Sequence, residues 1–225
     1  MEALILAGGK AKRLRPITDY IPKSLIPLNN IPIIEWQIRY LKKNGIDKII
    51  ICTGYKTEMI ENFLEMKNNF GINIGFSKER IPLGTGGAIK KAGSRIKDKS
   101  FFVLNGDIIT DIKLNELIKK PNSIASIELK TKFGIMEIKK DKILQFREKE
   151  EISNMWMNAG IYHLQKEIVK DLPKKGDIEK TLFPEYAEKR KLNTKKFKNV
   201  KWYSIDSFKD MEECSRVVDK IIKPV

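Results

Sequence analysis

The sequence has few of the residues that build disulfide frameworks or metal centres. It contains two cysteines, Cys52 and Cys214, which give no framework for disulfides or for a metal site. No apolar run reaches the roughly 20 residues that an α-helix needs to cross a bilayer. The first apolar stretch is too short for a signal peptide, because Gly8, Gly9 and Lys10 interrupt it. We therefore expect a cytoplasmic protein in a reducing compartment, with no membrane partner.

Acidic residues are also few compared with basic ones. The chain has 44 Lys and Arg against 29 Asp and Glu, a formal net charge of +15. Such an excess suits nucleic acid, an anionic membrane or phosphorylated substrates. However, the lysines are spread along the chain in pairs, and aromatic residues are not interleaved with them as a base-stacking surface requires. We expect most lysines on solvated faces and predict no nucleic-acid partner.

The first half of the chain repeats a short apolar run, a glycine-bearing loop and an amphipathic helix. The apolar runs predict buried strands over residues 3–7, 47–55, 72–77 and 100–107. Helical spacing of apolar residues predicts helices over residues 33–45, 57–67 and, after a glycine loop, 83–96. Apolar strands that alternate with helices favour a parallel sheet covered on both faces.

The second half alternates apolar and polar residues more regularly. The segments "SIASIEL", "FGIMEIKKDKILQFREK" and "NAGIYHL" predict an antiparallel portion, with a hairpin turn at "KKDK". Asp177 is expected to cap a helix that runs to Phe183, with Pro184 opening the next segment. A late strand over "KWYSID" and a closing helix from Phe208 to Ile222 complete the chain.

These elements predict an α/β fold with a Rossmann-like mixed, mostly parallel sheet. Helices should cover both faces of the sheet, and the small antiparallel portion should lie in the second half of the chain. The chain is long enough for a sizeable core and shows no internal repeat, low-complexity segment or linker. We predict one domain over residues 1–225.

Glycine and polar residues gather at the carboxyl ends of the predicted strands, where ligands bind in open α/β sheets. The first such loop, "AGGKAKRLRPIT", is neither a Walker A sequence nor G-x-G-x-x-G. Adjacent glycines let backbone N–H groups approach phosphate oxygens, and Arg13 adds a planar cation suited to phosphate. The alternative is a cationic turn packed by Leu14 and Pro16. The loop alone leaves both interpretations open.

Two further segments carry charge at this edge. In "PKSL", Lys23 lies between a proline and apolar residues, which suits a point charge directed into a site better than a solvated face. In "NGD", Asp107 ends a buried strand after a glycine, a common way to hold Mg²⁺ with few protein ligands. The alternative for Asp107 is a simple Asx turn.

In this order the segments resemble the motifs of the sugar-1-phosphate nucleotidylyltransferases, also called NDP-sugar pyrophosphorylases. The family's G-G-x-G-T-R-L-x-P-L-T and P-K-P-L stand here as "GGKAKRLRPIT" and "PKSL". Its G-T-[AG]-G loop stands as "LGTGGAI", its metal aspartate as "NGD" and its Y-G-V-V as "FGIMEI". Its E-K-P and N-A-G-[IF]-Y stand as "REKE" and "NAGIYHL". The resemblance runs from residue 2 to about residue 164 and covers the catalytic domain alone.

The resemblance implies a nucleotide-diphospho-sugar transferase-like fold and a reaction. A sugar 1-phosphate oxygen attacks the α-phosphate of an NTP, which releases pyrophosphate and an NDP-sugar. Arg13 and Lys23 would be catalytic, neutralising the triphosphate and the transition state. Asp107 would hold Mg²⁺ together with Asp206, which lies in "KWYSIDSFKD".

By the same resemblance, the substrates divide between two sets of residues. The nucleotide would bind at Leu6, Ala7, Gly8, Gly9, Gly84, Thr85, Gly86 and Gly87. The hexose and its phosphate would bind at Gly134, Glu148, Lys149 and Asn158.

The sequence departs from the family pattern in three segments. Ala11 and Lys12 replace the usual glycine and threonine of the first loop, Ser24 replaces the second proline of P-K-P, and Glu150 replaces the proline of E-K-P. None of these changes removes a charged catalytic group. They imply altered loop geometry or base contacts in an active enzyme, and they leave the choice of nucleotide open.

Within the family, the "PLGTGGAI" loop resembles guanylyl- and thymidylyl-transferring members, and of these we favour GTP with mannose 1-phosphate or a related hexose or heptose 1-phosphate. One alternative is a cytidylyltransferase for phosphocholine or another phospho-alcohol, because "PKSL" and "TGY" also occur in that group. An alternative of another class is an inactive module that binds nucleotide or nucleic acid. A homodimer is an assembly that the sequence allows. His163 is not expected to be catalytic, and Trp156 is expected to pack in the core sooner than to line the sugar pocket.

Overall fold

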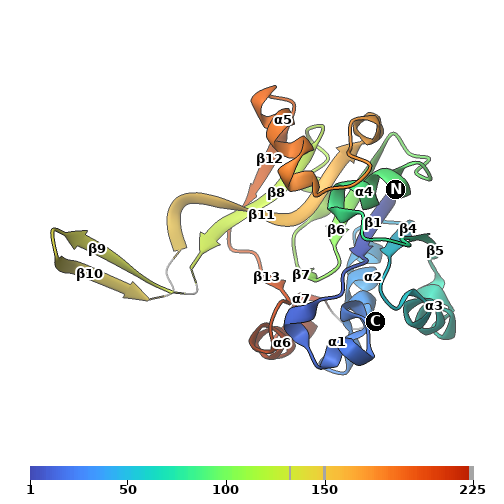
Figure 1. The fold of residues 1–225 in the computed structure, drawn as a ribbon, viewed down its shortest axis with the longest axis horizontal. Helices are drawn as coiled ribbons and strands as arrows, with labels where there is room; N and C mark the ends of the chain where they lie inside the picture. The colour runs from blue at the N-terminus through green and yellow to red at the C-terminus, as the bar shows by residue number, and fades with distance from the viewer. Residues whose placement is uncertain (132, 149–150, 223–225) are drawn as a thin grey trace.

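A seven-stranded sheet forms the centre of the computed structural model, which describes residues 1–131, 133–148 and 151–222 (Figure 1). Its strand order is β12-β8-β11-β6-β1-β4-β5. In chain order these strands are β1 (Glu2–Ala7), β4 (Lys48–Thr53), β5 (Asn73–Lys78), β6 (Ser100–Asn105), β8 (Ser123–Lys130), β11 (Glu151–Gln165) and β12 (Asn193–Phe197).

The pairing divides the sheet into two parts. β1 runs parallel to both β4 and β6, and β4 runs parallel to β5. β11 runs antiparallel to β6 and to β8, while β12 runs parallel to β8. The predicted mixed, mostly parallel sheet with its antiparallel portion in the second half is therefore confirmed. The carboxyl ends of β1, β4, β5 and β6 meet at one edge.

Helices cover both faces of the sheet, as predicted. On one face Ile34, Trp36 and Ile38 of α2 are buried in a core that also takes Ile60 of α3. On the other face Ile89 of α4 packs in a second core with side chains from the segment that contains α5. The helices are α1 (Ile17–Tyr20), α2 (Ile33–Lys43), α3 (Thr57–Met66), α4 (Gly84–Gly93), α5 (Leu182–Glu188), α6 (Phe208–Ser215) and α7 (Val218–Ile221).

Short strand pairs lie outside the main sheet. β2 (Pro27–Leu28) pairs with β3 (Ile31–Pro32), and β7 (Ile108–Thr110) pairs with β13 (Trp202–Ser204). β9 (Gly134–Lys139) and β10 (Lys142–Glu148) form the predicted hairpin around "KKDK". Figure 1 shows this hairpin as an arm that projects from the sheet. The late strand predicted over "KWYSID" thus exists, and it pairs with β7 rather than joining the main sheet.

Two predicted helices have different limits in the structure. A single 3₁₀ turn, Ile178–Lys180, follows Asp177, and α5 begins only at Leu182 and contains Pro184. Proline is tolerated there because the first helical turn needs no backbone N–H from it. The closing helix is broken into α6 and α7, because Val217 adopts φ −133° and leaves the helical region. The other 3₁₀ turns are Lys12–Leu14, Lys23–Leu25, Asn68–Gly71, Leu114–Glu116 and Lys166–Lys170.

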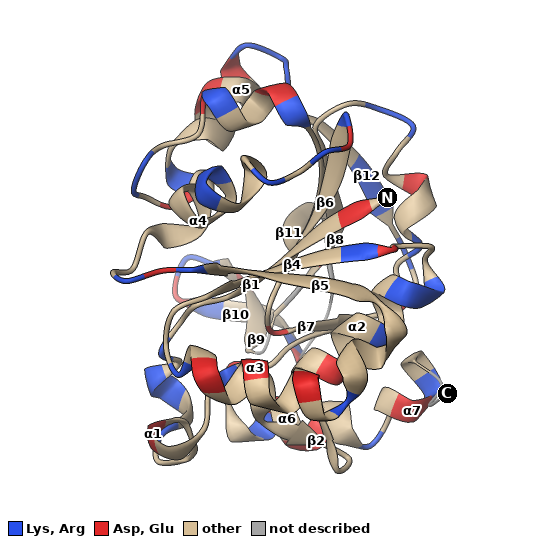
Figure 2. Cartoon of the chain, turned by 90° about the vertical axis from the view of Figure 1, so that its right-hand side faces the viewer, with Lys and Arg blue, Asp and Glu red and all other residues tan. Residues whose placement is uncertain are grey.

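The basic residues are spread over the fold. Figure 2 shows lysines and arginines on many helices and loops, with acidic residues between them. This distribution agrees with solvated lysine faces. Among the helices of the described residues, none combines the length and hydropathy that crossing a bilayer requires.

The buried carboxylate of Glu2 fastens the start of β1 to its neighbours. It accepts hydrogen bonds from the backbone N–H of Lys97 and of Asp98, the latter at 2.8 Å, and it pairs with Lys48. Burial favours the neutral acid, but these donors outweigh burial and lower the pKa of Glu2 below its ordinary value.

We expect Glu2→Gln to lower the free energy of unfolding at neutral pH by about 1–3 kcal/mol, because the amide loses the charge that the lysine and the two N–H groups stabilise. A lowered pKa in the folded state stabilises the protein at neutral pH, and that stabilisation is lost as the pH falls through the folded pKa. Urea denaturation should therefore show that the free energies of unfolding of Glu2→Gln and of the unaltered protein differ less at acidic pH than at neutral pH. The exposed Glu58→Gln is the control, and equal stability of Glu2→Gln and the unaltered protein at neutral pH would contradict this role.

Candidate functional site

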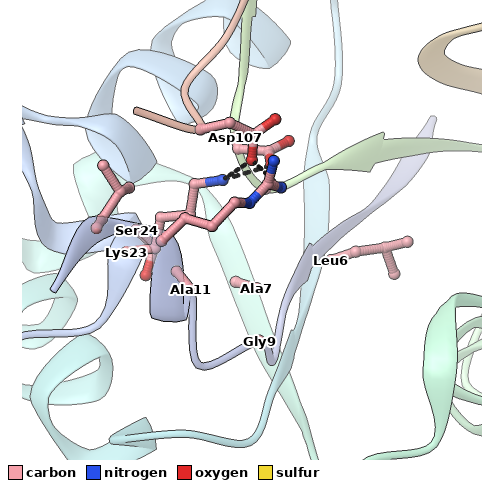
Figure 3. A pocket seen from close by; sticks show the side chains of 11 residues that line it. Leu6, Ala7, Gly9, Ala11, Lys23, Ser24 and Asp107 are labelled. Atoms are coloured by element: carbon pink, nitrogen blue, oxygen red, sulfur yellow. Dashed lines mark hydrogen bonds and ion pairs between the residues drawn. The ribbon is translucent and has the colours of Figure 1, made fainter. Parts of the chain in front are cut away.

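A pocket of about 190 Å³ opens at the carboxyl edge of the sheet, beyond the end of β1 (Figure 3). The loop after β1, the "PKSL" turn, the "NGD" loop and the segment after β13 all contribute to its wall. The lining residues are Leu6, Ala7, Gly9, Ala11, Arg13, Leu14, Lys23, Ser24, Gly106, Asp107 and Asp206.

Four charged side chains from distant parts of the chain meet in this pocket. The Nζ of Lys23 lies 2.6 Å from Oδ2 of Asp107 and 3.1 Å from Oδ1 of Asp206. Arg13 Nη2 lies 2.7 Å from the same oxygen of Asp206. The Lys23 side chain is only 16% exposed, whereas that of Arg13 is 77% exposed. Lys23 is thus held inside the site, and Arg13 remains accessible to a ligand.

The electrostatic state of Asp206 follows from this cluster. Burial favours its neutral form, but Lys23 and Arg13, together with a hydrogen bond from Ser204, hold its pKa below the ordinary value. Asp206 is therefore ionised at neutral pH and is able to attract a cation.

The backbone presents Asp107 at a fixed position. The N–H of Gly106 donates to Leu6 O at 3.0 Å, and a Cβ on Gly106 would lie 2.3 Å from that oxygen, so only glycine fits this close approach. The N–H of Ile205 donates to Asp107 O at 3.0 Å. A backbone hydrogen bond therefore joins the segment of Asp107 to the segment of Asp206, the two candidate metal ligands.

Gln37, which was not predicted as a site residue from the sequence, supports the same loop. This buried side chain of α2 donates through Nε2 to Asn105 O at 2.9 Å and to Ile108 O at 3.0 Å. It therefore holds the backbone on both sides of Asp107. Its sequence signal is weak, because Gln37 stands between the polar residues Glu35 and Arg39 in the same helix.

Ala11 adopts a left-handed backbone, the conformation for which glycine is best suited. Its φ of 45° and ψ of 50° lie in the left-handed region, which glycine enters without steric cost. Leu14 N and Thr18 Oγ1 both donate to Ala11 O, at 3.0 and 3.1 Å. The replacement therefore leaves the turn in place, although an alanine pays roughly 1–2 kcal/mol to adopt it.

The donor set formed by Asp107 and Asp206 fits a hard divalent cation. Both carboxylates contact the ammonium group of Lys23, so a positive charge already lies between them. Within residues 1–131, 133–148 and 151–222, no group of three or more His, Cys, Asp or Glu is arranged to hold a metal. Mg²⁺ suits this pair, because it is commonly bound by one or two carboxylates and by substrate phosphates.

A second pocket of about 330 Å³ adjoins the first and shares Leu6, Gly9, Gly106 and Asp107 with it. The glycine loop predicted from the sequence is the first turn of α4 in the structure, and it forms one wall through Gly84 and Thr85. Gly84 has a φ of +74°, and a Cβ there would lie 2.6 Å from Gly176 C. The predicted nucleotide residues Gly8, Gly84 and Thr85 thus line a cavity continuous with the charged cluster. Gly86 and Gly87 are buried behind it.

The second pocket also contains Glu79, another residue that was not predicted from the sequence. It follows the end of β5, and its Oε2 accepts a hydrogen bond from Leu83 N at 2.9 Å. Burial raises the pKa of Glu79 despite this hydrogen bond and the nearby Lys91. An acidic residue just beyond a predicted strand was the signal that could have found it.

The residues expected to bind the sugar are only partly brought together. Asn158 lines a third pocket of about 470 Å³ with Trp156, Thr194 and Lys196 among others. Trp156 is half-buried there, and Lys196 Nζ lies 4.8 Å from its ring centroid.

Gly134 and Glu148 instead pair with each other at the base of the arm formed by β9 and β10. Lys149 and Glu150 lie outside the described residues. His163 is buried beside Phe102 within the sheet, and burial lowers its pKa. It does not line any of these pockets.

Comparison with known proteins gives a family match and close relatives. The family model described as "Nucleotidyl transferase" matches residues 2–220. A D-glycero-alpha-D-manno-heptose 1-phosphate guanylyltransferase of Campylobacter jejuni is 38% identical over 205 residues, covering 88% of this chain and 88% of that protein. A mannose-1-phosphate guanyltransferase of Yarrowia lipolytica is 39% identical over 209 residues, covering 85% of this chain and 57% of that protein.

Solved structures are similar along nearly the whole chain. HddC from Yersinia pseudotuberculosis has a TM-score of 0.77 and 28% identity, and the match covers 96% of this chain and 98% of that one. A structure of HddC complexed with GMP-PN has a TM-score of 0.75 and 27% identity, with the same coverage.

Proposed function

Because this chain belongs to the nucleotidyl transferase family, we propose that it transfers a guanylyl group from GTP to a hexose or heptose 1-phosphate. The products are a GDP-sugar and pyrophosphate. The observation that carries the proposal is the cluster in which Lys23 bridges Asp107 and Asp206 beside Arg13. The named guanylyltransferase relatives support this choice over the phosphocholine cytidylyltransferase alternative.

In this reaction an ionised oxygen of the sugar 1-phosphate attacks the α-phosphorus of GTP, and the bond to pyrophosphate breaks. The attacking oxygen already carries negative charge, so no protein side chain has to remove a proton. The protein's task is to align two anions and to stabilise the charge that accumulates. Arg13 and Lys23 are proposed to bind the triphosphate, with backbone N–H groups of Gly8 and Gly9 as further donors.

Nucleotidyl transferases of this family generally use a divalent metal. We propose that Asp107 and Asp206 hold Mg²⁺, which when bound supplies positive charge to the phosphate oxygens. Gln37 and the backbone of Gly106 keep the loop of Asp107 rigid, so this carboxylate needs little reorganisation.

Glu79 is proposed to select guanine. Its Oε2 is engaged by Leu83 N, while its Oε1 faces the loop after β1, where a Cβ on Gly8 would lie 3.2 Å away. An ionised carboxylate only accepts hydrogen bonds. Guanine presents two adjacent donors, N1–H and the 2-amino group, and adenine places an acceptor at N1. A carboxylate in the nucleotide pocket therefore favours guanine.

We expect Glu79→Gln to raise the Kd for GTP about 10- to 100-fold, because a hydrogen bond to a charged group contributes about 1.5–3 kcal/mol. The raised pKa of Glu79 adds a pH test: GTP affinity should fall as the pH drops through that raised pKa, and Glu79→Gln should lose this dependence. Calorimetric titration with GTP at several pH values measures both effects. The exposed Glu65→Gln is the control, and an unchanged preference for GTP over ATP in Glu79→Gln would refute the assignment.

The proposed function is tested by measuring pyrophosphate release from each common NTP. Mannose 1-phosphate, a heptose 1-phosphate and phosphocholine serve as acceptors. We expect turnover with GTP and a sugar 1-phosphate. Turnover restricted to CTP and phosphocholine would favour the alternative, and salt-sensitive RNA binding without turnover would favour the inactive module. The cytoplasmic location, the homodimer and the single-domain organisation over residues 1–225 stay predictions from the sequence.

A further inference from the structure

Glu179 lies between the glycine loop at the start of α4 and strand β11. The proposed reaction gives it no role. It is half-buried on the 3₁₀ turn Ile178–Lys180. Its Oε2 accepts a hydrogen bond from Thr85 Oγ1 at 2.6 Å. Its Oε1 accepts a hydrogen bond from the Tyr162 hydroxyl at 3.0 Å. One carboxylate thus binds a hydroxyl from each of two elements that line different pockets.

The first contact is part of a close attachment to the glycine loop. Thr85 Oγ1 also accepts a hydrogen bond from Ile178 N at 2.9 Å. Gly176 O accepts from Gly86 N and Gly87 N at 3.0 and 3.3 Å, and Gly176 N donates to Leu83 O at 2.7 Å. The segment from Gly176 to Glu179 is therefore hydrogen-bonded to the start of α4, which forms a wall of the nucleotide pocket.

The second contact leads towards the predicted sugar residue. The Tyr162 side chain is fully buried, and its hydroxyl accepts a hydrogen bond from Asn158 Nδ2 at 2.9 Å. Asn158 Oδ1 in turn accepts from Gly160 N at 2.8 Å. Burial, with the negative charge of Glu179 nearby, raises the pKa of Tyr162, so its hydroxyl keeps the proton that it donates.

These contacts form a continuous path from Thr85 through Glu179 and Tyr162 to Asn158. We infer that Glu179 is a positioning residue that couples the glycine loop at the start of α4 to Asn158, the predicted sugar-binding residue. This inference rests on the proposed function. When GTP fixes the glycine loop, the carboxylate fixes the Tyr162 hydroxyl, which orients Asn158. A carboxylate suits this task because it accepts from both hydroxyls at once.

The most direct test is Glu179→Gln, which preserves the shape of the side chain. An amide has a single acceptor oxygen, so one of the two hydroxyl protons loses its acceptor. We expect KM to rise several-fold for both GTP and the sugar 1-phosphate, with kcat/KM lowered about 10- to 100-fold, the range for a lost hydrogen bond to a charged group. Glu185→Gln, an exposed glutamate of α5, is the matched control and should leave both KM values unchanged.

A double-mutant cycle separates coupling from simple structural support. Thr85→Val removes one hydroxyl and Tyr162→Phe removes the other. Because both hydroxyls bind the same carboxylate, we expect their effects on kcat/KM to be non-additive in the unaltered background and additive in Glu179→Gln. This cycle in the unaltered background also tests the proposal if Glu179→Gln does not fold, which thermal denaturation would reveal.

The outcomes distinguish this inference from the function on which it rests. If the unaltered protein turns over, two results overturn the coupling and leave the proposed function intact. One is unchanged KM values in a folded Glu179→Gln, and the other is an additive double-mutant cycle. A rise in only one KM likewise overturns it. Absence of turnover by the unaltered protein with every NTP and sugar 1-phosphate overturns both.

Discussion

Replacing Asp107 with asparagine is expected to lower turnover about a thousandfold, a loss on the scale of removing one preorganised electrostatic group from an active site. The carboxylate contacts Lys23 at 2.6 Å and lies opposite Asp206 on the same ammonium group. An amide keeps the shape of this side chain but loses the negative charge. It would therefore bind a divalent cation poorly and leave the phosphates less neutralised.

The fold of Asp107→Asn should survive, because the loop is held by other contacts. Gly106 N bonds to Leu6 O, Ile205 N bonds to the main-chain oxygen of residue 107, and Gln37 binds the carbonyls on either side. Turnover is measured as pyrophosphate release over a range of Mg²⁺ concentrations, with thermal denaturation to confirm folding. Asp98→Asn, whose side chain is 46% exposed and lies before β6, is the control. Retention of turnover within about tenfold would contradict the role of Asp107.

Lys23→Met is the second change with a large expected effect. Methionine keeps much of the length of the lysine and removes the ammonium that is shared by Asp107 and Asp206. Lys23 is 16% exposed, so solvent screens its charge less than it screens the charge of Arg13. We expect kcat/KM to fall about 100- to 1,000-fold, as for the loss of a group that stabilises transition-state charge.

The same variant has a consequence for stability that does not depend on turnover. Without Lys23, two carboxylates face each other with Arg13 as the nearest cation, so Asp206 loses the main partner that holds its pKa low. Added Mg²⁺ should therefore raise the Tm of Lys23→Met more than that of the unaltered protein, because no ammonium competes with the metal. Lys23→Arg, which keeps a charge, should respond less to Mg²⁺ than Lys23→Met. Equal shifts of Tm in all three proteins would contradict the metal site.

The sequence predicted those parts of the site that depend on local pattern. The strand of β1, the glycines after it and the aspartate of the "NGD" loop follow from apolar runs and turn residues alone. The arrangement of Lys23 with Asp206 did not follow, since these residues are 183 positions apart and meet only when β13 pairs with β7. The resemblance to a family supplied Asp206, and the topology explains why that aspartate lies beside Asp107.

Residues that act through long-range hydrogen bonds were not predictable. Gln37 lies among other polar residues of its helix, and its two backbone partners are 68 and 71 positions away. Glu179 binds Thr85 across 94 positions, from a turn that the pattern predicted as helix. Glu79 had a local signal at the end of β5, but its burial and its orientation towards the loop after β1 depend on the packing of separate segments. For Gln37 and Glu179 the polar partner is defined only once the sheet edge has folded.

The most direct test of the central claim is to identify the phosphorus products formed by the unaltered protein. The protein is incubated with GTP, Mg²⁺ and mannose 1-phosphate, or with a heptose 1-phosphate, and followed by ³¹P NMR. The proposed reaction yields equal amounts of pyrophosphate and of a nucleoside diphosphate ester whose β-phosphorus couples to the sugar, with no free orthophosphate. Formation of GDP and orthophosphate, or absence of any turnover with each sugar 1-phosphate, would contradict it.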